Sequence, residues 1–136
     1  MQYKFEQPIT ASNLSEAYRV EIQWRNGKIY ADEPVHVGGK DTAPDPFTLL
    51  LASLASCTLS TLRMYIARKK WNITDIKVSM NLFQETENGF NTTIIRDFHV
   101  GHDISEEQKS RLELIASKCP ISKLLTKSIA VKTSIN

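Results

Sequence analysis

The beginning of the chain alternates polar and apolar residues with a period of two. The apolar positions of the clearest run are Tyr18, Val20, Ile22 and Trp24. Because successive side chains of a strand point to opposite faces, this alternation predicts a half-buried strand. Asn26 and Gly27 follow it and predict a tight type I′ turn with positive φ angles, after which residues 29–31 continue as a second strand. Tyr3 and Phe5 predict another strand ahead of this hairpin.

A loop of turn-forming residues separates these strands from a long apolar segment. Residues 32–46 contain Pro34, Pro44 and two adjacent glycines, and ordered loops of this length are often functional. Asp45 before Pro46 predicts the N-cap and first turn of a helix that runs to about Lys70. The first half of this helix is apolar almost all round, so we expect it to be buried on every side.

The pattern then returns to strands. The apolar positions of the next strand are Ile76, Val78, Met80 and Leu82. Asn88 and Gly89 predict a second hairpin turn, and residues 90–100 predict the returning strand. The sequence therefore predicts two antiparallel hairpins, one before and one after the long helix along the chain.

The end of the chain predicts two helical segments and a last strand. Two candidate capping boxes precede the first helix: Asp103 with Glu106, and Ser105 with Gln108. The apolar stripe of this helix is Leu112, Ile115, Ala116 and Cys119. Pro120 interrupts it, a short helical segment continues through Leu125, and the alternation over residues 129–133 predicts a final strand.

This order of elements predicts an α+β fold with antiparallel sheets around a long buried central helix. The length suits a single domain that covers residues 1–136. One small sheet is not enough to cover a helix that is apolar on every side. We therefore expect a homodimer in which two subunits wrap their central helices together.

Composition and charge exclude several classes of function. The 17 Lys and Arg residues against 15 Asp and Glu residues give a formal net charge of +2, so we expect no nucleic-acid partner. The most apolar stretch, residues 47–57, is too short to span a bilayer, and the N-terminus lacks the apolar region of a signal peptide. We expect no membrane partner and a cytoplasmic protein, in which the two cysteines are free thiols.

The two cysteines lie in different sequence environments. Cys57 lies in the predicted buried helix, where a cysteine is most often a small hydrophobic core residue. Cys119 directly precedes Pro120, which predicts that Cys119 caps the start of a new helix. Exposed amides and the helix dipole at such a position lower the pKa of a thiol. The alternative is that Cys119 is simply the last apolar position of the preceding helix.

Two thiols that meet in a fold have the parts of a thiol peroxidase. One thiolate attacks the peroxide and becomes a sulfenic acid, and the second thiol converts it to a disulfide. The spacing of the two cysteines does not say whether they meet, and the site also needs a cation near the first sulfur. His36, His99 and His102 are better explained as surface residues than as metal ligands, so we expect no metal and no organic cofactor.

Three segments of the chain resemble a known family. They read ADEPVHVGGKDTAPDPFTLLLASLASCTLSTL, ASKCPISKLL and IAVKTSI. Together they are similar to the OsmC/Ohr family of osmotically inducible and organic hydroperoxide resistance proteins, over roughly residues 18–135. The most specific elements are a Pro-led apolar helix that carries Cys57 and a second Cys-Pro pair at Cys119. The ADEP and GGKD stretches resemble the broad OsmC-like branch more than the Ohr enzymes proper.

The resemblance implies an intertwined α+β homodimer that reduces organic hydroperoxides with a cysteine pair near the dimer interface. Cys57 matches the peroxide-attacking thiol of the family, and Cys119 matches the resolving thiol. The capping argument above makes Cys119 the more activated thiol, whereas the resemblance assigns the first attack to Cys57. Arg25, in the segment WRNG, resembles the arginine that the family places near the attacking sulfur, and an exposed residue before the hairpin turn is the equally weighted alternative.

The chain departs from the family pattern at one position of this site. The family's peroxidases have a glutamate after the proline that opens the central helix, and this chain has Phe47 after Pro46. The arginine therefore lacks the carboxylate that orients it. Glu33 in the preceding loop is the candidate substitute.

Two functions are compatible with the sequence. The first is a thiol-dependent peroxidase for bulky organic hydroperoxides, in oxidative stress defence, that cycles Cys57 and Cys119 with a thiol reductant. Its substrate would lie in an apolar pocket lined by Phe47, Leu50, Leu54 and Met64. The alternative is a non-catalytic dimer that binds a hydrophobic small molecule and keeps both cysteines merely buried.

Overall fold

The computed structural model describes residues 2–85 and 91–136, which form two compact units. The N-terminal unit is Met1–Leu50 and the C-terminal unit is Leu51–Asn136. The two units contain antiparallel sheets and a long helix, as the α+β prediction requires. That the units together make a single domain stays a prediction.

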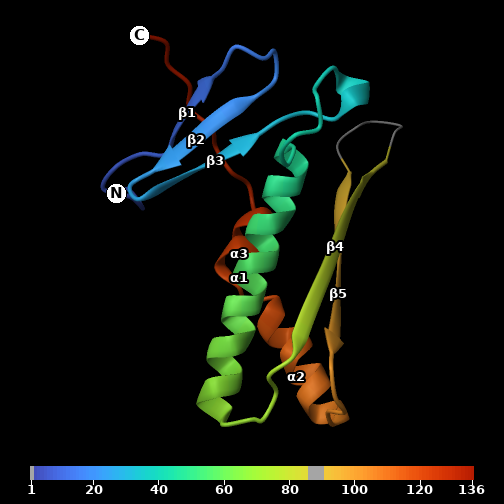
Figure 1. Cartoon of the computed structure of the whole chain (residues 1–136). Coiled ribbons are helices and arrows are strands. Elements are labelled where there is room, and N and C mark those ends of the chain that lie inside the picture. The colour runs from blue at the N-terminus through green and yellow to red at the C-terminus, as the bar shows by residue number, and fades with distance from the viewer. Residues whose placement is uncertain (1, 86–90) are drawn as a thin grey trace. The chain divides into compact units, whose positions relative to one another are not determined.

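The N-terminal unit contains a three-stranded antiparallel sheet. Its strands are β1 (Thr10–Asn13), β2 (Val20–Trp24) and β3 (Gly27–Ala31), in the order β1-β2-β3 (Figure 1). The predicted β2–β3 hairpin is confirmed, with Val20 opposite Ala31 and Trp24 opposite Gly27. The predicted strand at Tyr3 and Phe5 is wrong, because both side chains are exposed and the first strand begins only at Thr10.

The hairpin turn differs from the prediction by one residue. Its two connecting residues are Arg25 and Asn26, and neither Asn26 nor Gly27 has a positive φ. Gly27 already belongs to β3, where a Cβ atom would come within 2.5 Å of Cζ2 of Trp24. The glycine is therefore needed for the close approach of the Trp24 ring and not for a left-handed backbone.

The loop after β3 is fastened by a buried carboxylate. Asp32 accepts hydrogen bonds from the backbone amide of Glu33 at 2.8 Å, from the Thr42 amide at 3.2 Å and from the Thr42 hydroxyl at 2.6 Å. These contacts, led by the Thr42 hydroxyl, lower the pKa of Asp32 to about 2. A short 3-10 helix, η1 (Val35–Val37), lies between the two fastened ends.

The long helix α1 (Pro46–Lys69) begins and ends where the sequence predicts. Oδ1 of Asp45 accepts a hydrogen bond from the Thr48 amide at 2.9 Å, which is the contact of an N-cap aspartate. At the other end, Lys70 has a left-handed φ of 57°, which stops the helix. Both boundaries follow from local signals.

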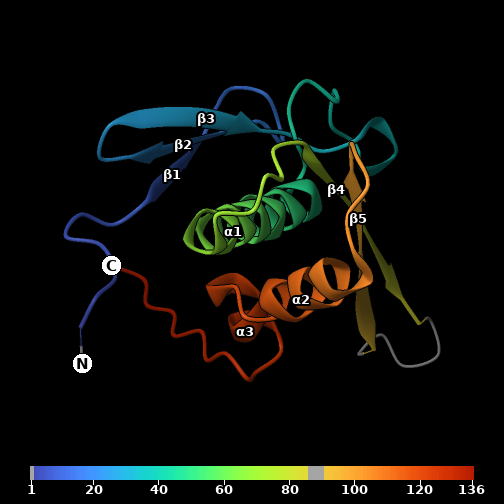
Figure 2. The same cartoon turned by 90° about the horizontal axis from the view of Figure 1, so that it is seen from below.

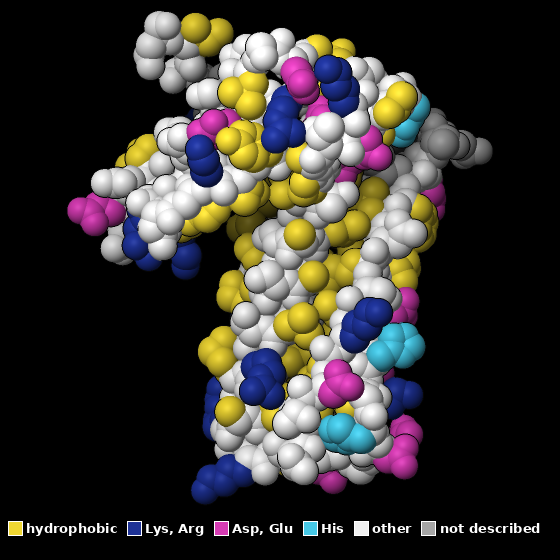
Figure 3. Space-filling view, in the orientation of Figure 1, with side chains coloured by type: hydrophobic (Ala, Val, Ile, Leu, Met, Phe, Trp, Pro, Cys, Tyr) yellow, Lys and Arg dark blue, Asp and Glu magenta, His cyan; other side chains and the backbone are white. Residues whose placement is uncertain are grey.

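A single chain does not bury α1 on every side, and its burial by a second subunit stays a prediction. One stripe is buried: Leu54, Thr58, Leu62, Tyr65 and Ile66. Phe47, Leu50 and Met64 are exposed, and hydrophobic side chains reach the surface along α1 in Figure 3. The elements packed against a helix in a single chain cover one face of it, so an all-round apolar pattern does not by itself produce all-round burial.

By length and composition, α1 would also pass as a membrane-crossing helix, although residues 47–57 alone are too short for one. The buried stripe gives the better explanation. Leu62 and Ile66 pack with Ile73, Leu112 and Ala116 in the core of the C-terminal unit, as the core helix of a folded domain does.

The C-terminal unit combines a hairpin with two short helices. The strands β4 (Ile76–Gln84) and β5 (Thr92–Val100) pair along their whole length, from Ile76 opposite Val100 to Gln84 opposite Thr92. The helices α2 (Glu106–Ala116) and α3 (Pro120–Leu125) lie on one side of α1, as Figure 2 shows. The turn predicted at Asn88 and Gly89, with Phe90 after it, lies outside the described residues.

The start of α2 distinguishes the two predicted capping boxes. Ser105 caps the helix, its hydroxyl accepts from the Gln108 amide at 3.1 Å, and the Gln108 side chain accepts from the Ser105 amide at 3.0 Å. The box at Asp103 and Glu106 is wrong, because Glu106 is the first residue of the helix and not its third.

The final strand predicted over residues 129–133 is wrong. In the described part of the chain, no strand pairs with this segment, and Ile129 and Val131 are exposed. A strand needs a neighbouring backbone to satisfy its amide and carbonyl groups. The alternation of apolar and polar residues is present, but it describes only the order of side chains and does not provide a neighbouring strand.

Candidate functional site

Cys119 occupies the junction between α2 and α3. It is the N-cap of α3, with Pro120 as the first helical residue, and its Sγ accepts a hydrogen bond from the Ser122 amide at 3.3 Å. The side chain is also fully buried. The capping interpretation is therefore confirmed. The alternative, that Cys119 is the last apolar position of the preceding helix, is wrong because α2 ends at Ala116, although the Cys119 side chain is buried.

A chain of side chains connects this thiol to β5. Oγ1 of Thr58, on α1, lies 3.9 Å from Sγ of Cys119. Nη1 of Arg96, on β5, donates a hydrogen bond to the same Thr58 oxygen at 3.0 Å. Thr58 is fully buried and Arg96 is half-buried. Residues from three elements therefore meet at one hydroxyl group.

These surroundings lower the pKa of the Cys119 thiol. Burial raises it, because a thiolate loses its hydration in the protein interior. The Ser122 amide and the side chains of Cys57 and Thr58 stabilise the thiolate by hydrogen bonding, and the positive charge of Arg96 acts in the same direction. The stabilising contacts outweigh burial, so a larger fraction of Cys119 is ionised than of an ordinary cysteine.

Cys57 is the neighbour of Cys119 in space. It directly precedes Thr58 on α1, and its side chain is close enough to contribute to the lowered pKa of Cys119. Both thiols are free, and Cys57 is only partly buried whereas Cys119 is buried. The fold thus brings together the two cysteines whose spacing in the sequence left the question open.

Thr58 and Arg96 were missed by the sequence analysis. Arg96 has a readable signal, because it stands on the inward-facing positions of β5, in phase with Ile94, Phe98 and Val100. A charged residue in the apolar phase of a strand needs a polar partner inside the protein. Thr58 has no such signal, since a threonine within an apolar helix is compatible with ordinary packing.

The remaining predicted site residues belong to different parts of the chain. Arg25, Glu33, Phe47 and Leu50 lie in the N-terminal unit, where Arg25 is exposed. Arg25 lines a hollow of about 740 Å³ together with Trp24, Asn26, Ile9 and residues 4–7. Leu54 lies in the C-terminal unit, is buried, and its carbonyl accepts the Thr58 hydroxyl at 2.7 Å.

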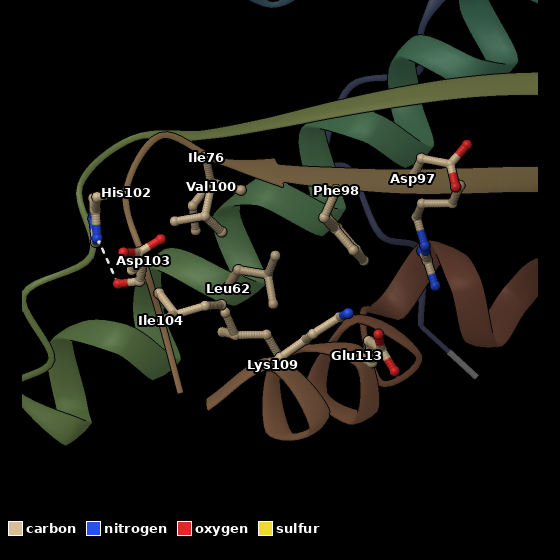
Figure 4. Close-up of a pocket in the computed structure, with 12 residues that line it drawn as sticks. Leu62, Ile76, Asp97, Phe98, Val100, His102, Asp103, Ile104, Lys109 and Glu113 are labelled. Atoms are coloured by element: carbon tan, nitrogen blue, oxygen red, sulfur yellow. Dashed lines mark hydrogen bonds between the residues drawn. The ribbon is translucent and has the colours of Figure 1, made fainter. Parts of the chain in front are cut away.

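The C-terminal unit also has a cavity of about 530 Å³ between α1, β5 and α2. Its apolar walls include Leu62, Phe98 and Ile104, and Lys109 approaches them from α2 (Figure 4). Arg96 lines this cavity as well as contacting Thr58. Across residues 2–85 and 91–136, no three His, Cys, Asp or Glu side chains form a cluster that could hold a metal ion.

Comparison with solved structures shows the same fold in several proteins. A protein of Psychrobacter arcticus is 18% identical, with a TM-score of 0.77 over 91% of each chain. The organic hydroperoxide resistance protein OsmC of Legionella pneumophila is 22% identical, with a TM-score of 0.66 over 90% of this chain and 91% of its own. An organic hydroperoxide resistance protein of Elizabethkingia anophelis is 20% identical, with a TM-score of 0.64 over 90% of each chain.

The comparison of sequences identifies the family. No curated protein sequence matches the chain. The model of the OsmC-like protein family matches residues 39–134, which include α1 with Cys57, the β4–β5 hairpin with Arg96 and the α2–α3 junction with Cys119. The chain therefore belongs to the OsmC-like protein family.

Proposed function

We propose that this protein is a thiol-dependent peroxidase that reduces organic hydroperoxides and acts in the cytoplasm in oxidative stress defence. The observation that carries the proposal is the proximity of two free thiols from distant parts of the sequence, one partly buried and one buried. The names of the Legionella and Elizabethkingia relatives support the substrate class.

Accessibility supports Cys57 as the thiol that meets the peroxide. A hydroperoxide can approach the partly buried Cys57 more easily than the fully buried Cys119. The Cys57 sulfur attacks the distal peroxide oxygen, the O–O bond breaks, and an alcohol leaves. The thiol Cys57–SH and ROOH thus become Cys57–SOH and ROH, with the sulfur oxidised and the peroxide reduced.

Cys119 then acts as the resolving thiol. Its sulfur attacks the Cys57 sulfur of the sulfenic acid, the S–O bond breaks, and the hydroxyl group leaves with the Cys119 proton as water. The lowered pKa of Cys119 supports this role, because the thiolate is the attacking species. Two molecules of a thiol reductant then reduce the disulfide and become a disulfide themselves.

The rest of the proposed site involves residues of the N-terminal unit and a second subunit. Arg25 would hold the Cys57 sulfur ionised. Glu33 would orient Arg25, because Phe47 stands where the family's peroxidases have the orienting glutamate. Phe47, Leu50 and Leu54 would contact the apolar part of the hydroperoxide. The apolar side chains that a single chain leaves exposed along α1 support an intertwined homodimer.

The experiment is the intact mass of the reduced protein after one equivalent of an organic hydroperoxide, beside hydrogen peroxide. We expect the loss of two hydrogens per chain, faster with the organic peroxide. Cys57→Ser should abolish peroxide consumption, and Cys119→Ser should stop after one turnover with one added oxygen at Cys57. A Cys57→Ser protein that consumes peroxide at the parent rate would contradict the proposal.

A binding protein without chemistry is the second candidate, and the cavity of about 530 Å³ favours it. It predicts a hydrophobic small molecule that co-purifies and is visible by native mass spectrometry. It also predicts equal, slow labelling of both thiols by an alkylating reagent at neutral pH. Fast and selective labelling of one thiol supports the peroxidase instead.

A further inference from the structure

The Thr58 hydroxyl has three hydrogen-bonding neighbours but only one proton to donate. A hydroxyl group donates one hydrogen bond and accepts two, whereas a guanidinium group can only donate. Arg96 therefore occupies a lone pair of Oγ1 of Thr58. The hydroxyl proton is left with two possible acceptors, the Leu54 carbonyl at 2.7 Å and the Cys119 sulfur at 3.9 Å.

The choice between these acceptors depends on the state of Cys119. When Cys119 is a thiol, its S–H can point to the Thr58 oxygen and the Thr58 proton remains on the Leu54 carbonyl. When Cys119 is a thiolate, the sulfur becomes a charged acceptor and attracts the Thr58 proton. The Arg96 hydrogen bond draws electron density from the Thr58 oxygen and makes the hydroxyl a stronger donor.

Arg96 places a positive charge among the inward-facing residues of β5. It is half-buried on the inner face of β5, and its guanidinium lies 6.0 Å from the centre of the Phe98 ring. Asp97 is the next residue, yet its side chain points away from that of Phe98 in Figure 4. Within the described residues no carboxylate lies within 4.0 Å of Arg96, so its strongest contact is Thr58. Arg96 is therefore a half-buried cation whose side-chain hydrogen bond goes to the Thr58 hydroxyl.

We propose that Arg96 and Thr58 form a positioning relay that prepares Cys119 for the disulfide-forming half of the catalytic cycle. Arg96 acts through Thr58 and does not itself contact the sulfur. The relay rests on the proposed function, in which Cys119–SH and Cys57–SOH become the disulfide and water. Thr58 holds the attacking sulfur as a thiolate until the S–O bond of Cys57 breaks.

The charged groups around Cys119 agree with this assignment. On its own side of the fold, Lys118 and Lys123 are close in sequence, but both are exposed to solvent. Arg96 is the charged group in the described part of the chain whose field lowers the pKa of Cys119. Removing Arg96 should therefore have an effect on Cys119 that removing an exposed cation does not have.

The first test separates the two halves of the cycle. Thr58→Val keeps the side-chain shape and removes the hydroxyl, whereas Thr58→Ser keeps the hydroxyl. After one equivalent of organic hydroperoxide, we expect Thr58→Val to accumulate the Cys57 sulfenic acid, with disulfide formation slower on the order of tenfold. Thr58→Ser should form the disulfide at close to the parent rate, and Thr61→Val is the matched control on the same helix.

Arg96 is tested with a graded pair of variants. Arg96→Met should slow disulfide formation as Thr58→Val does, and Arg96→Lys, which keeps a charge and a donor, should restore part of the rate. Arg111→Met removes an exposed arginine and should leave the rate unchanged. Equal rates of disulfide formation in the parent, Thr58→Val and Arg96→Lys would overturn the relay, even where Arg96→Met does not fold.

The second test does not depend on peroxide chemistry. In a Cys57→Ser background, Cys119 is the one remaining thiol, and its ionisation can be followed by thiolate absorbance against pH. The midpoint should rise in Thr58→Val and in Arg96→Met and return toward the parent in Thr58→Ser. An unchanged midpoint overturns the relay. A shifted midpoint in this background, with a parent protein of both cysteines that consumes no peroxide, supports the positioning of Cys119 by Thr58 and Arg96 and rejects the peroxidase.

Discussion

Asp32 and Cys119 are both buried acids with a lowered pKa, and they differ in where their partners come from. The partners of Asp32 are Glu33 and Thr42, at most 10 residues away. Cys119 contacts Thr58, which is 61 residues away, and Thr58 in turn accepts from Arg96 on a different strand. One site closes a loop, and the other brings remote elements together.

The difference teaches how to distinguish a structural acid from a chemical one. Asp32 is satisfied by fixed amides and a hydroxyl of its own loop, so its ionised state fastens the loop and leaves nothing to react. Cys119 has a second thiol beside it and a hydroxyl whose proton can change partners. A lowered pKa alone does not mark a functional site, whereas a lowered pKa beside a second thiol makes Cys119 a candidate for one.

The largest loss of stability is expected for a substitution in the core beneath Thr58 and Cys119. Leu62 lies one helical turn after Thr58, is fully buried and packs on Leu112 and Ala116. Leu62→Ala should reduce the free energy of unfolding by about 2–5 kcal/mol, because the cavity it leaves cannot close completely. Urea unfolding measures this loss.

Met64 provides the matched control on the same helix. Its side chain is 62% exposed in the single chain, so Met64→Ala should change the free energy of unfolding of the monomer by no more than about 0.5 kcal/mol, and a larger loss in the assembled protein would reflect the proposed dimer. If Leu62→Ala cost as little as Met64→Ala, the packing under the thiol site would not be what holds it in place.

A smaller effect, confined to acid, is expected at Asp32. Its pKa in the folded protein is about 2 against an ordinary 3.8, so its contribution to stability is complete above 3.8 and is lost as the pH falls towards 2. Thr42→Val removes the shortest hydrogen bond to the carboxylate and should raise the pKa of Asp32 towards 3.8. The loss of stability in acid then becomes smaller and its pH window narrower, because the upper end of the window stays at 3.8 while the lower end rises.

An NMR titration of the Asp32 carboxyl carbon measures this pKa directly. Thr42→Ser retains the hydroxyl and should titrate like the parent. A Thr42→Val protein whose Asp32 titrates at the parent midpoint would show that the two backbone amides are sufficient, and that the hydroxyl contributes nothing to the fastening of the loop.

The same division between local and remote contacts explains what the sequence could predict. The caps at Asp45 and Cys119 were readable because each depends on residues within one turn. The family resemblance supplied the cysteine pair as an expectation. The inward position of Arg96 on its strand was readable, but its contact with Thr58 was not, because no local pattern says that a strand position and a helix position meet at one hydroxyl.

The failures have the same physical origin. The alternation over residues 129–133 predicts which side chains share a face, but the pairing of a strand depends on a second backbone elsewhere. Gly27 was assigned to a positive φ because its neighbours fit a common turn, whereas the Trp24 ring determines its use. The hydrophobic period and the composition describe one segment of the chain at a time, whereas the burial of a side chain depends on several segments that pack together.

The smallest effect is expected for a local contact within the C-terminal unit. It tests whether the pKa of Cys119 depends on its contacts with Thr58 and Arg96 or on the stability of this unit as a whole. Ser105→Ala removes the hydroxyl that accepts from the Gln108 amide and should cost about 1 kcal/mol in urea unfolding. Because the capping box involves only the first turn of α2, the pH midpoint of Cys119 should not change. A shifted Cys119 midpoint in Ser105→Ala would mean that the thiol responds to any loosening of this unit, and the special dependence on Thr58 and Arg96 would be lost.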